Sequence, residues 1–333
     1  MQKISNGVGL VLSGGGAKGA YQVGVVRALA EMEIQVDAVS GASIGSLNAA
    51  MVSGSPNLTY AAEGMEAVWK ALSGDDHPLK LDAIALSWKF GSALASVYGG
   101  DIGKLLVSTV APQMPESGLC CSKHVLSLLQ KYLPLDSLST GLPFWVSVYP
   151  SDGFKTDMLN IAKAILGGDT KESEFLHINK MANADSRVRA LLASAAIPLA
   201  FPRQKIDGKL YVDGGKKKKK KSSGNTPIQP LLDFGCNHVL VTHLSDGSLW
   251  SRHDFPNATI LEIRPEGIER SIGDLLDFSG SSIDAWIKQG YRDTLRCVEP
   301  IRRALQLRQA SQKAKIQSNV ALARLQNDGF EIV

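Results

Sequence analysis

The chain has 333 residues, of which 44% are hydrophobic, and its formal net charge is +4. This length and apolar content provide a buried core for one large domain or two smaller ones, which excludes a disordered chain. Removing the six consecutive lysines at 216–221 from the 36 basic residues leaves a net charge of −2 against 32 acidic residues, so the basicity is one local feature.

Cysteine usage and hydropathy give a first expectation about the compartment. Cys120 and Cys121 are adjacent while Cys236 and Cys297 are isolated, a pattern typical of neither a metal site nor a disulfide framework. The N-terminal apolar run stops at five residues, and no run of eighteen apolar residues follows. We expect a cytoplasmic protein, soluble or peripheral to a membrane, with no metal, no cofactor and no nucleic-acid partner.

The first apolar run, "VGLVL", leads into a glycine-rich turn at Gly14, Gly15 and Gly16. Gly14, Gly16 and Gly19 match G-x-G-x-x-G, a pattern that also binds dinucleotide phosphates. A nucleotide P-loop is excluded because the last glycine is not followed by Lys and then Ser or Thr. The remaining interpretation is an oxyanion hole, in which backbone N–H groups stabilise the negative oxygen formed when a nucleophile attacks an ester.

The second expected strand runs into "GASIG", in which Gly41, Ser43 and Gly45 match the nucleophile-elbow pattern G-x-S-x-G. In an elbow a sharp strand-to-helix turn lifts the serine hydroxyl clear of the sheet, and the dipole of the following helix, expected at 44–52, favours an oxyanion there. A dinucleotide site typically has an acidic residue at the end of this strand, but Asp37 lies at its start. We therefore prefer the oxyanion interpretation.

The rest of the chain alternates between helical and strand patterns. Residues 58–135 are mostly helical in pattern and form a candidate cap over the site, and a further helix is expected at 186–198. Strand patterns occur at 143–149, 174–178, 209–213, 238–244 and 258–263. This order predicts a three-layer α/β/α fold with a mostly parallel central sheet. An elbow on only the second strand differs from α/β-hydrolases, in which several strands precede it.

Residues 284–326 predict a long C-terminal helix, and 301–326 contain six basic residues and no acidic one. Such a helix either lies on a membrane or partner, or packs its apolar side on the domain. We expect a domain of residues 1–270 and a helical segment 271–333 that packs on it or regulates it. For the lysines at 216–221 three interpretations stay open: a solvated loop, attraction to anionic lipid, or a stretch foreign to the natural chain.

A serine needs a base within hydrogen-bond reach, and the residues alone leave two candidates. His243, at the end of an apolar strand, would form a triad with Asp246 or Asp254. Asp213, at the end of another strand and followed by two glycines, would act alone if partial desolvation raises its pKa.

Three blocks resemble those of patatin-like phospholipases: "GGGAKG" (14–19), "GASIG" (41–45) and "DGG" (213–215), preceded by "ASAAIPLAFP" (193–202). The resemblance implies a Ser–Asp dyad without histidine, with Ser43 as nucleophile, Asp213 as base and Gly14, Gly15 and Gly16 as the oxyanion turn. It also implies that Lys18 is the basic residue of that turn and that Gly214 and Gly215 belong to the aspartate motif. The lysine run lengthens the link between this motif and Asn225-Thr226-Pro227.

Residues 231–265 and the helical tail are also similar to bacterial patatin-like effectors of the CapV type, which a cyclic dinucleotide such as cyclic GMP-AMP activates. This resemblance implies a phospholipase that is idle until the nucleotide binds and then degrades membrane phospholipids in anti-phage defence. Trp250, Arg252 and His253 are the candidate nucleotide ligands. The alternatives are an esterase without gating and a non-catalytic nucleotide-binding module, and a homo-oligomer is an open expectation.

Overall fold

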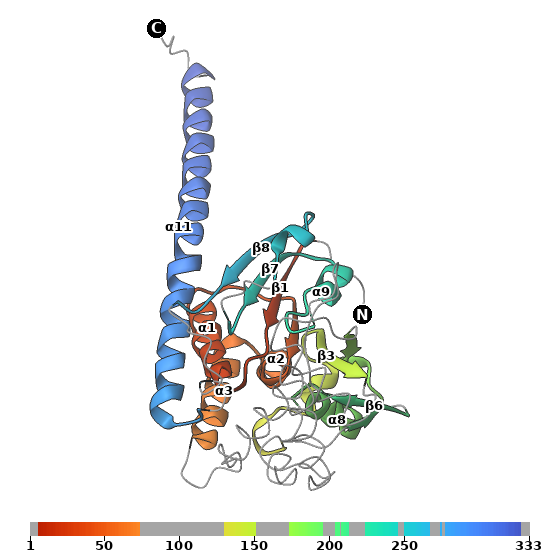
Figure 1. The fold of residues 1–333 in the computed structure, drawn as a ribbon. Helices are drawn as coiled ribbons and strands as arrows, with labels where there is room; N and C mark the ends of the chain where they lie inside the picture. Colours follow the sequence, from red (N-terminus) through yellow and green to blue (C-terminus); the bar gives the residue numbers. More distant parts are fainter. Residues whose placement is uncertain are drawn as a thin grey trace, which may run out of the picture.

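The computed structural model describes residues 6–73, 130–150, 173–195, 204–206, 208–212, 224–245, 250–266, 274 and 277–327. Within these ranges the chain forms a mostly parallel sheet flanked by helices, which confirms the predicted fold class (Figure 1).

Five parallel strands form the main part of the sheet, in the order β3-β2-β1-β7-β8. Their bounds are Gly7–Leu12 (β1), Ala38–Ala42 (β2), Phe144–Pro150 (β3), Cys236–Thr242 (β7) and Thr259–Ile263 (β8). Because β1 and β2 are parallel neighbours, the glycine turn after β1 and the elbow after β2 emerge at the same edge of the sheet.

An antiparallel group flanks β3 on its other side. β4 (Glu174–His177) and β6 (Lys209–Val212) both pair with β3, and the short β5 (Gln204–Ile206) pairs with β6. The strand patterns in the sequence locate β3, β4, β6, β7 and β8 correctly. β5 was not predicted, because three residues are too few to show a period of two.

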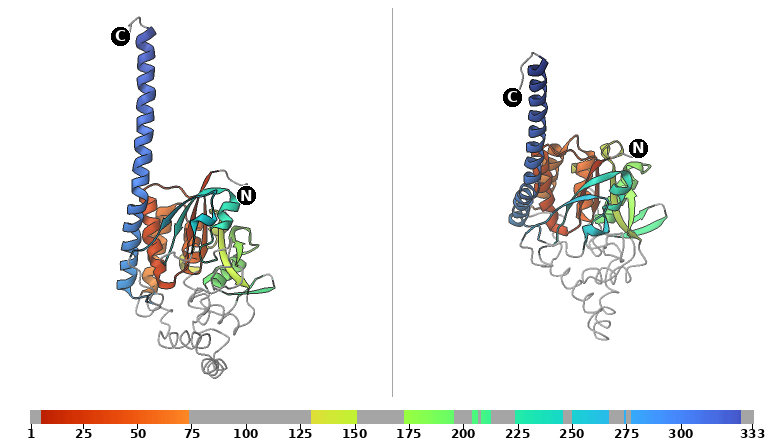
Figure 2. Two further views of the ribbon diagram at one scale, coloured as in Figure 1. Left: turned by 45° about the horizontal axis from the view of Figure 1, so that its top comes forward. Right: turned by 90° about the horizontal axis from the view of Figure 1, so that it is seen from above.

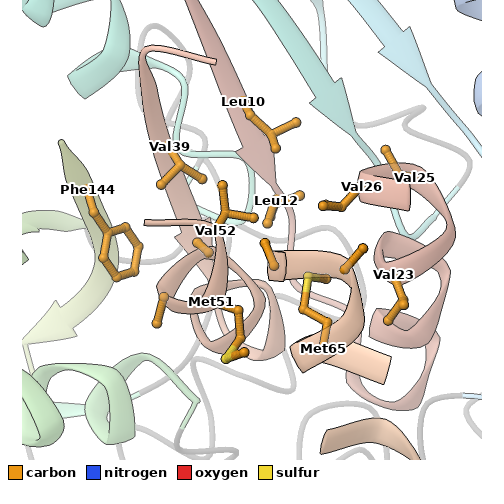
Figure 3. Close-up of a cluster of buried hydrophobic side chains, with 14 of the residues drawn as sticks. Leu10, Leu12, Val23, Val25, Val26, Val39, Met51, Val52, Met65 and Phe144 are labelled. Carbon is orange, nitrogen blue, oxygen red and sulfur yellow. The ribbon is translucent and has the colours of Figure 1, made fainter. Parts of the chain in front are cut away.

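Helices cover both faces of the sheet. α1 (Ala20–Glu31), α2 (Ile44–Gly54), α3 (Leu58–Leu72) and α8 (Ala184–Ala195) pack on the face that carries Leu10, Leu12 and Val39 (Figure 3). The short α9 (Gln229–Phe234) packs on the opposite face with Val11 and Val241. Successive strand residues point to opposite faces, so the unbroken apolar run of β1 supplies both cores.

The expected cap at 58–135 is described only in part. α3 belongs to the helical layer rather than to a cap, because Met65 and Trp69 are buried in the same core as α1 and α2. Residues 74–129 of the expected cap lie outside the described ranges.

The long helix expected at 284–326 is present as α11 (Gly280–Asn327). Its first part packs closely on α1: a Cβ added to Gly290 would lie 1.9 Å from the Tyr21 carbonyl oxygen, and one added to Gly24 would lie 2.0 Å from the Ile287 oxygen. The Tyr21 hydroxyl donates to Asp293 across this contact at 3.1 Å. The remainder of α11 extends beyond the rest of the fold (Figures 1 and 2). Among the helices described, none is long and apolar enough to cross a membrane.

Candidate active site

Ser43 has an unusual backbone conformation at the turn between β2 and α2. Its φ of 51° and ψ of −130° place a non-glycine residue in a region that costs on the order of 1–3 kcal/mol. Such strain persists only where the surroundings hold it, and it is the conformation expected of a nucleophile elbow. Ser43 is 9% exposed, so it borders on solvent without projecting far into it.

The two elbow glycines are required by close backbone approach. A Cβ on Gly45 would lie 2.2 Å from the carbonyl oxygen of Leu12 and 2.6 Å from that of Ser13. A Cβ on Gly41 would lie 2.4 Å from the Gly45 oxygen. No side chain fits at either position, which gives the G-x-S-x-G pattern its physical reason in this chain.

Hydrogen bonds hold the Ser43 backbone from both sides. Its N–H donates to the Ser194 Oγ of α8 at 3.1 Å. Its carbonyl oxygen accepts from the N–H of Ser46 at 2.9 Å and from the Ser46 Oγ at 2.6 Å. The backbone is thereby fixed, and none of these three bonds uses the Ser43 hydroxyl.

The glycine turn lies directly against the elbow. A Cβ on Gly14 would be 2.8 Å from the Ser43 Cβ and 2.5 Å from the Asn225 Oδ1. The Gly14 N–H donates to the Asn225 carbonyl at 3.3 Å, and the Asn225 side-chain amide donates to the Gly14 carbonyl at 3.3 Å. Asn225 therefore holds the turn against the serine.

A buried polar network anchors both ends of this turn. Gln22 donates to the Ser13 carbonyl at 2.7 Å, and Asn48 donates to the Gly19 carbonyl at 3.0 Å. Asn48 also donates to Gln22 at 2.8 Å and accepts from the Trp69 indole at 3.1 Å. This network was not predicted, although Gln22 and Asn48 stand out as polar residues among apolar neighbours.

Comparison with known proteins identifies the family of this chain. A family model described as "Patatin-like phospholipase" matches residues 10–232. The chain belongs to this family.

The curated relatives share short, well-matched segments with this patatin-like chain. A patatin-like phospholipase domain-containing protein of Caenorhabditis elegans is 49% identical over 74 residues, 20% of this chain and 6% of the relative. Patatin-like phospholipase domain-containing protein 7 of mouse is 32% identical over 100 residues, 28% of this chain and 7% of the relative. The matched segments thus span less than a tenth of either relative's length. Among solved structures, VipD from Legionella pneumophila matches with a TM-score of 0.40 and 14% identity, covering 90% of this chain and 68% of that one.

Asp213, Gly214 and Gly215 of the patatin aspartate motif lie outside the described residues, as do the lysines at 216–221. The chain on either side is described. Val212 pairs with Tyr149 at the end of β6, and after the gap the Thr226 Oγ1 lies 3.1 Å from the Ser13 Oγ. The Ser40 Oγ donates to the Pro227 carbonyl at 2.5 Å, which anchors the returning segment beneath the glycine turn.

Lys18, predicted to be the basic residue of the glycine turn, is buried and directed toward the C-terminal segment. Its Nζ lies 3.6 Å from the Asp274 carboxylate and 5.7 Å from the centre of the Trp286 ring of α11. An ammonium buried at 3% exposure requires such partners. Lys18 thus connects the glycine turn to α11.

His243 is engaged by a carboxylate that the sequence analysis did not consider. Its Nε2 lies 3.0 Å from the Glu262 Oε2, and Glu262 also accepts from Arg264. Burial opposes ionisation of Glu262, but the hydrogen bonds from His243 and Arg264 outweigh it and lower its pKa from 4.5 to about 2. In the described part of the chain no hydrogen bond joins His243 to Ser43.

The candidate nucleotide ligands differ in accessibility. Arg252 and His253 are exposed on the 3₁₀ turn Arg252–Asp254, whereas Trp250 is buried and stacks on Phe255 with ring centres 5.7 Å apart. Within the described ranges, no group of three or more His, Cys, Asp or Glu side chains is placed to hold a metal ion.

Proposed function

We propose that this chain is a serine-dependent lipid acyl hydrolase of the phospholipase A type, with Ser43 as nucleophile and Asp213 as general base. The observation that carries the proposal is the strained Ser43 turn with the Gly14 backbone packed against it. A strained serine is expected where its hydroxyl must be presented to a substrate, and a glycine turn beside it supplies donors for an oxyanion.

In the proposed reaction the Ser43 Oγ attacks the carbonyl carbon of an acyl ester while Asp213 takes the hydroxyl proton. The tetrahedral oxyanion collapses, and the alcohol leaves with the proton returned from Asp213. Water then attacks the acyl-serine ester, losing its proton to Asp213, and the fatty acid is released with Ser43 reprotonated. Family membership and the order of the three motifs support Asp213 as the base.

Gly15 and Gly16 are the better oxyanion donors within the turn. The Gly14 N–H is already directed to the Asn225 carbonyl. Within the described residues, the N–H groups of Gly15 and Gly16 donate to no protein acceptor. We therefore assign the oxyanion to these two groups, with Gly14 providing the close approach to Ser43. Losing one donor of this kind costs about 10² to 10³ in rate.

Labelling with a fluorophosphonate probe tests the nucleophile, because only an activated serine reacts. We expect labelling of the natural chain, none in Ser43→Ala, and strong loss in Asp213→Asn. His243→Gln should remain labelled, since His243 is paired with Glu262. Labelling that survives Ser43→Ala, or that depends on His243 rather than Asp213, would contradict the proposed dyad.

We further propose that a cyclic dinucleotide such as cyclic GMP-AMP activates this hydrolase to degrade bacterial membrane phospholipids in anti-phage defence. The similarity of residues 231–265 to cyclic dinucleotide-gated effectors supports this. Arg252 and His253 are exposed and can reach a phosphate, whereas the buried Trp250 cannot stack on a base without rearrangement. Fatty-acid release with and without a panel of cyclic dinucleotides tests the gating, and equal release without nucleotide would show an ungated esterase.

We also propose that the projecting part of α11 contacts the anionic surface of the substrate membrane. Ile316 and Val320 are exposed by 64% and 48%. Residues 301–326 contain six basic residues and no acidic one. This charge favours anionic lipid and disfavours pairing with a second copy of the same helix.

A further inference from the structure

One buried hydroxyl of the segment 193–202, which precedes the aspartate motif, contacts the proposed nucleophile directly. Ser194 belongs to α8 and is fully buried, at 0% exposure. Its Oγ lies 3.1 Å from the Ser43 backbone nitrogen and 2.7 Å from the Ser147 carbonyl oxygen of β3.

The chemistry of the groups fixes the direction of both hydrogen bonds. A carbonyl oxygen only accepts, so the single hydroxyl hydrogen of Ser194 is committed to Ser147. A backbone N–H only donates, so the Ser43 N–H donates to a lone pair of the same Ser194 oxygen. Ser194 therefore links β3 and α8 to the turn through one hydroxyl group.

We propose that Ser194 is a positioning residue, whose hydroxyl holds the Ser43 turn in the conformation that presents the nucleophile. The inference rests on the proposed role of Ser43. The turn has a φ of 51° at Ser43 and is stable only while its surroundings impose it. The Ser46 contacts hold the carbonyl side of Ser43, and Ser194 is the partner of its N–H side.

Removing the hydroxyl leaves both the Ser43 N–H and the Ser147 carbonyl without this partner. The buried N–H then favours a different backbone conformation in which another acceptor or water reaches it. A displacement of about 1 Å at a reacting group lowers rate by about 10²-fold. We expect Ser194→Ala to slow fluorophosphonate labelling and kcat by about 10- to 100-fold, with KM unchanged.

Ser53→Ala is the matched control for this substitution. Ser53 is a buried helical serine whose Oγ donates to a backbone carbonyl, that of Leu142, at 2.6 Å, but it lies at the far end of α2 from Ser43. Removing a hydroxyl that has only a structural role lowers the stability of the fold but does not slow the reaction of Ser43. The Ser53 variant should therefore keep the labelling rate of the natural chain within about threefold, whatever its effect on unfolding.

Amide hydrogen exchange of the peptide that contains Ser43 gives a readout independent of activity. We expect faster exchange of the Ser43 N–H in Ser194→Ala and no change in Ser53→Ala. If Ser194→Ala does not fold, Ser194→Cys decides, because its thiol is larger than the hydroxyl and fills the site but is only a weak donor and acceptor. Ser194→Cys should then give a smaller loss of the same kind.

The outcomes separate the two proposals. Unchanged labelling rate and unchanged Ser43 exchange in Ser194→Ala, or in Ser194→Cys, would overturn the positioning role. Faster Ser43 exchange in a chain whose serine is never labelled would support the positioning of the turn and reject the proposed nucleophile. Slower labelling with faster exchange, both absent in Ser53→Ala, supports both.

Discussion

Ser43 is constrained through its backbone while its hydroxyl is left for chemistry. Three hydrogen bonds hold its N–H and carbonyl groups, and two glycines allow neighbouring backbone to approach within contact distance. The absence of a side chain at these positions is therefore required by the packing of Gly45 against the end of β1 and of Gly41 against the start of α2.

The first prediction at this scale concerns Gly45. A methyl group there would lie 2.2 Å from the Leu12 carbonyl oxygen, and the backbone must shift to admit it. We expect Gly45→Ala to lower the free energy of unfolding by about 1–3 kcal/mol, measured by urea denaturation. Gly280→Ala is the control, because its nearest atoms lie 4.0 Å away. Equal stability of the two variants would contradict the packing described for the elbow.

The second prediction concerns acid stability and Glu262. Its pKa in the folded protein, about 2, lies below the ordinary 4.5, because burial is outweighed by hydrogen bonds from His243 and Arg264. The ionised carboxylate therefore stabilises the fold above pH 4.5, and this contribution is lost as the pH falls from 4.5 toward 2. Its size is about 3 kcal/mol at most.

Glu262→Gln should consequently make the free energy of unfolding less dependent on pH in the acid range. The measurement is the free energy of unfolding of both proteins at pH 6 and at pH 3. The natural chain should lose more stability than the variant over this interval. Parallel losses in the two proteins would show that the Glu262 pair does not contribute to the acid sensitivity.

The sequence patterns identified the candidate nucleophile but not the residues that hold its turn and the surrounding site in place. The G-x-S-x-G spacing is local, and the structure shows Ser43 at the strained turn that the pattern predicts. Gln22, Asn48, Ser194 and Glu262 could not be assigned from the sequence, because each contacts residues distant in the chain. The partner of His243 is an example: Asp246 and Asp254 were nearest in sequence, whereas Glu262 is the neighbour across the β7–β8 pair.

Among the elements, those with a long periodic pattern were predicted and the shortest were not. The two parallel strands before the glycine turn and the elbow, and the helix after the elbow, followed from apolar runs and turn residues. β5 and α9 are three and six residues long and carry little periodicity. The antiparallel pairing of β6 with β3 depends on tertiary contacts that no local pattern encodes.

α11 consists of two parts with different expected contributions. Its first part packs on α1 and contributes buried residues as far as Val298, Glu299 pairs with Arg303 within the helix, and the remainder projects from the fold (Figure 2). A chain ending at Arg303 should therefore keep its free energy of unfolding within about 1 kcal/mol. The measurement is urea denaturation of the full and the shortened chain.

The same shortened chain tests membrane contact. Four of the six basic residues lie beyond Arg303, each worth about 1 kcal/mol near an anionic surface, so affinity for vesicles of anionic phospholipid should fall at least about 100-fold. Ile316→Glu in the full chain should weaken binding without affecting stability, because this side chain is 64% exposed. Unchanged vesicle binding in both would contradict the proposed surface, and a large loss of stability on shortening would contradict the division of α11.

In the whole molecule the glycine turn is where the separate parts of the chain meet. β1 and β2 bring the turn and the elbow to one sheet edge, Asn225 closes the turn from the segment before α9, and Lys18 connects it to Asp274 and α11. Family membership indicated the motifs that take part, and the structure adds contacts that come from outside those motifs. The division of the chain near residue 270 stays a prediction, although α11 packs closely on α1.

The central claim is that Ser43 and Asp213 together hydrolyse acyl esters of phospholipids. The most direct measurement is the release of fatty acid from mixed phospholipid vesicles by the natural chain, Ser43→Ala and Asp213→Asn, each with and without cyclic dinucleotides. We predict release by the natural chain that is lost in both variants, and that appears only with a cyclic dinucleotide if the enzyme is gated. Release that persists in either variant, or its absence from the natural chain under every condition, would contradict the dyad hydrolase.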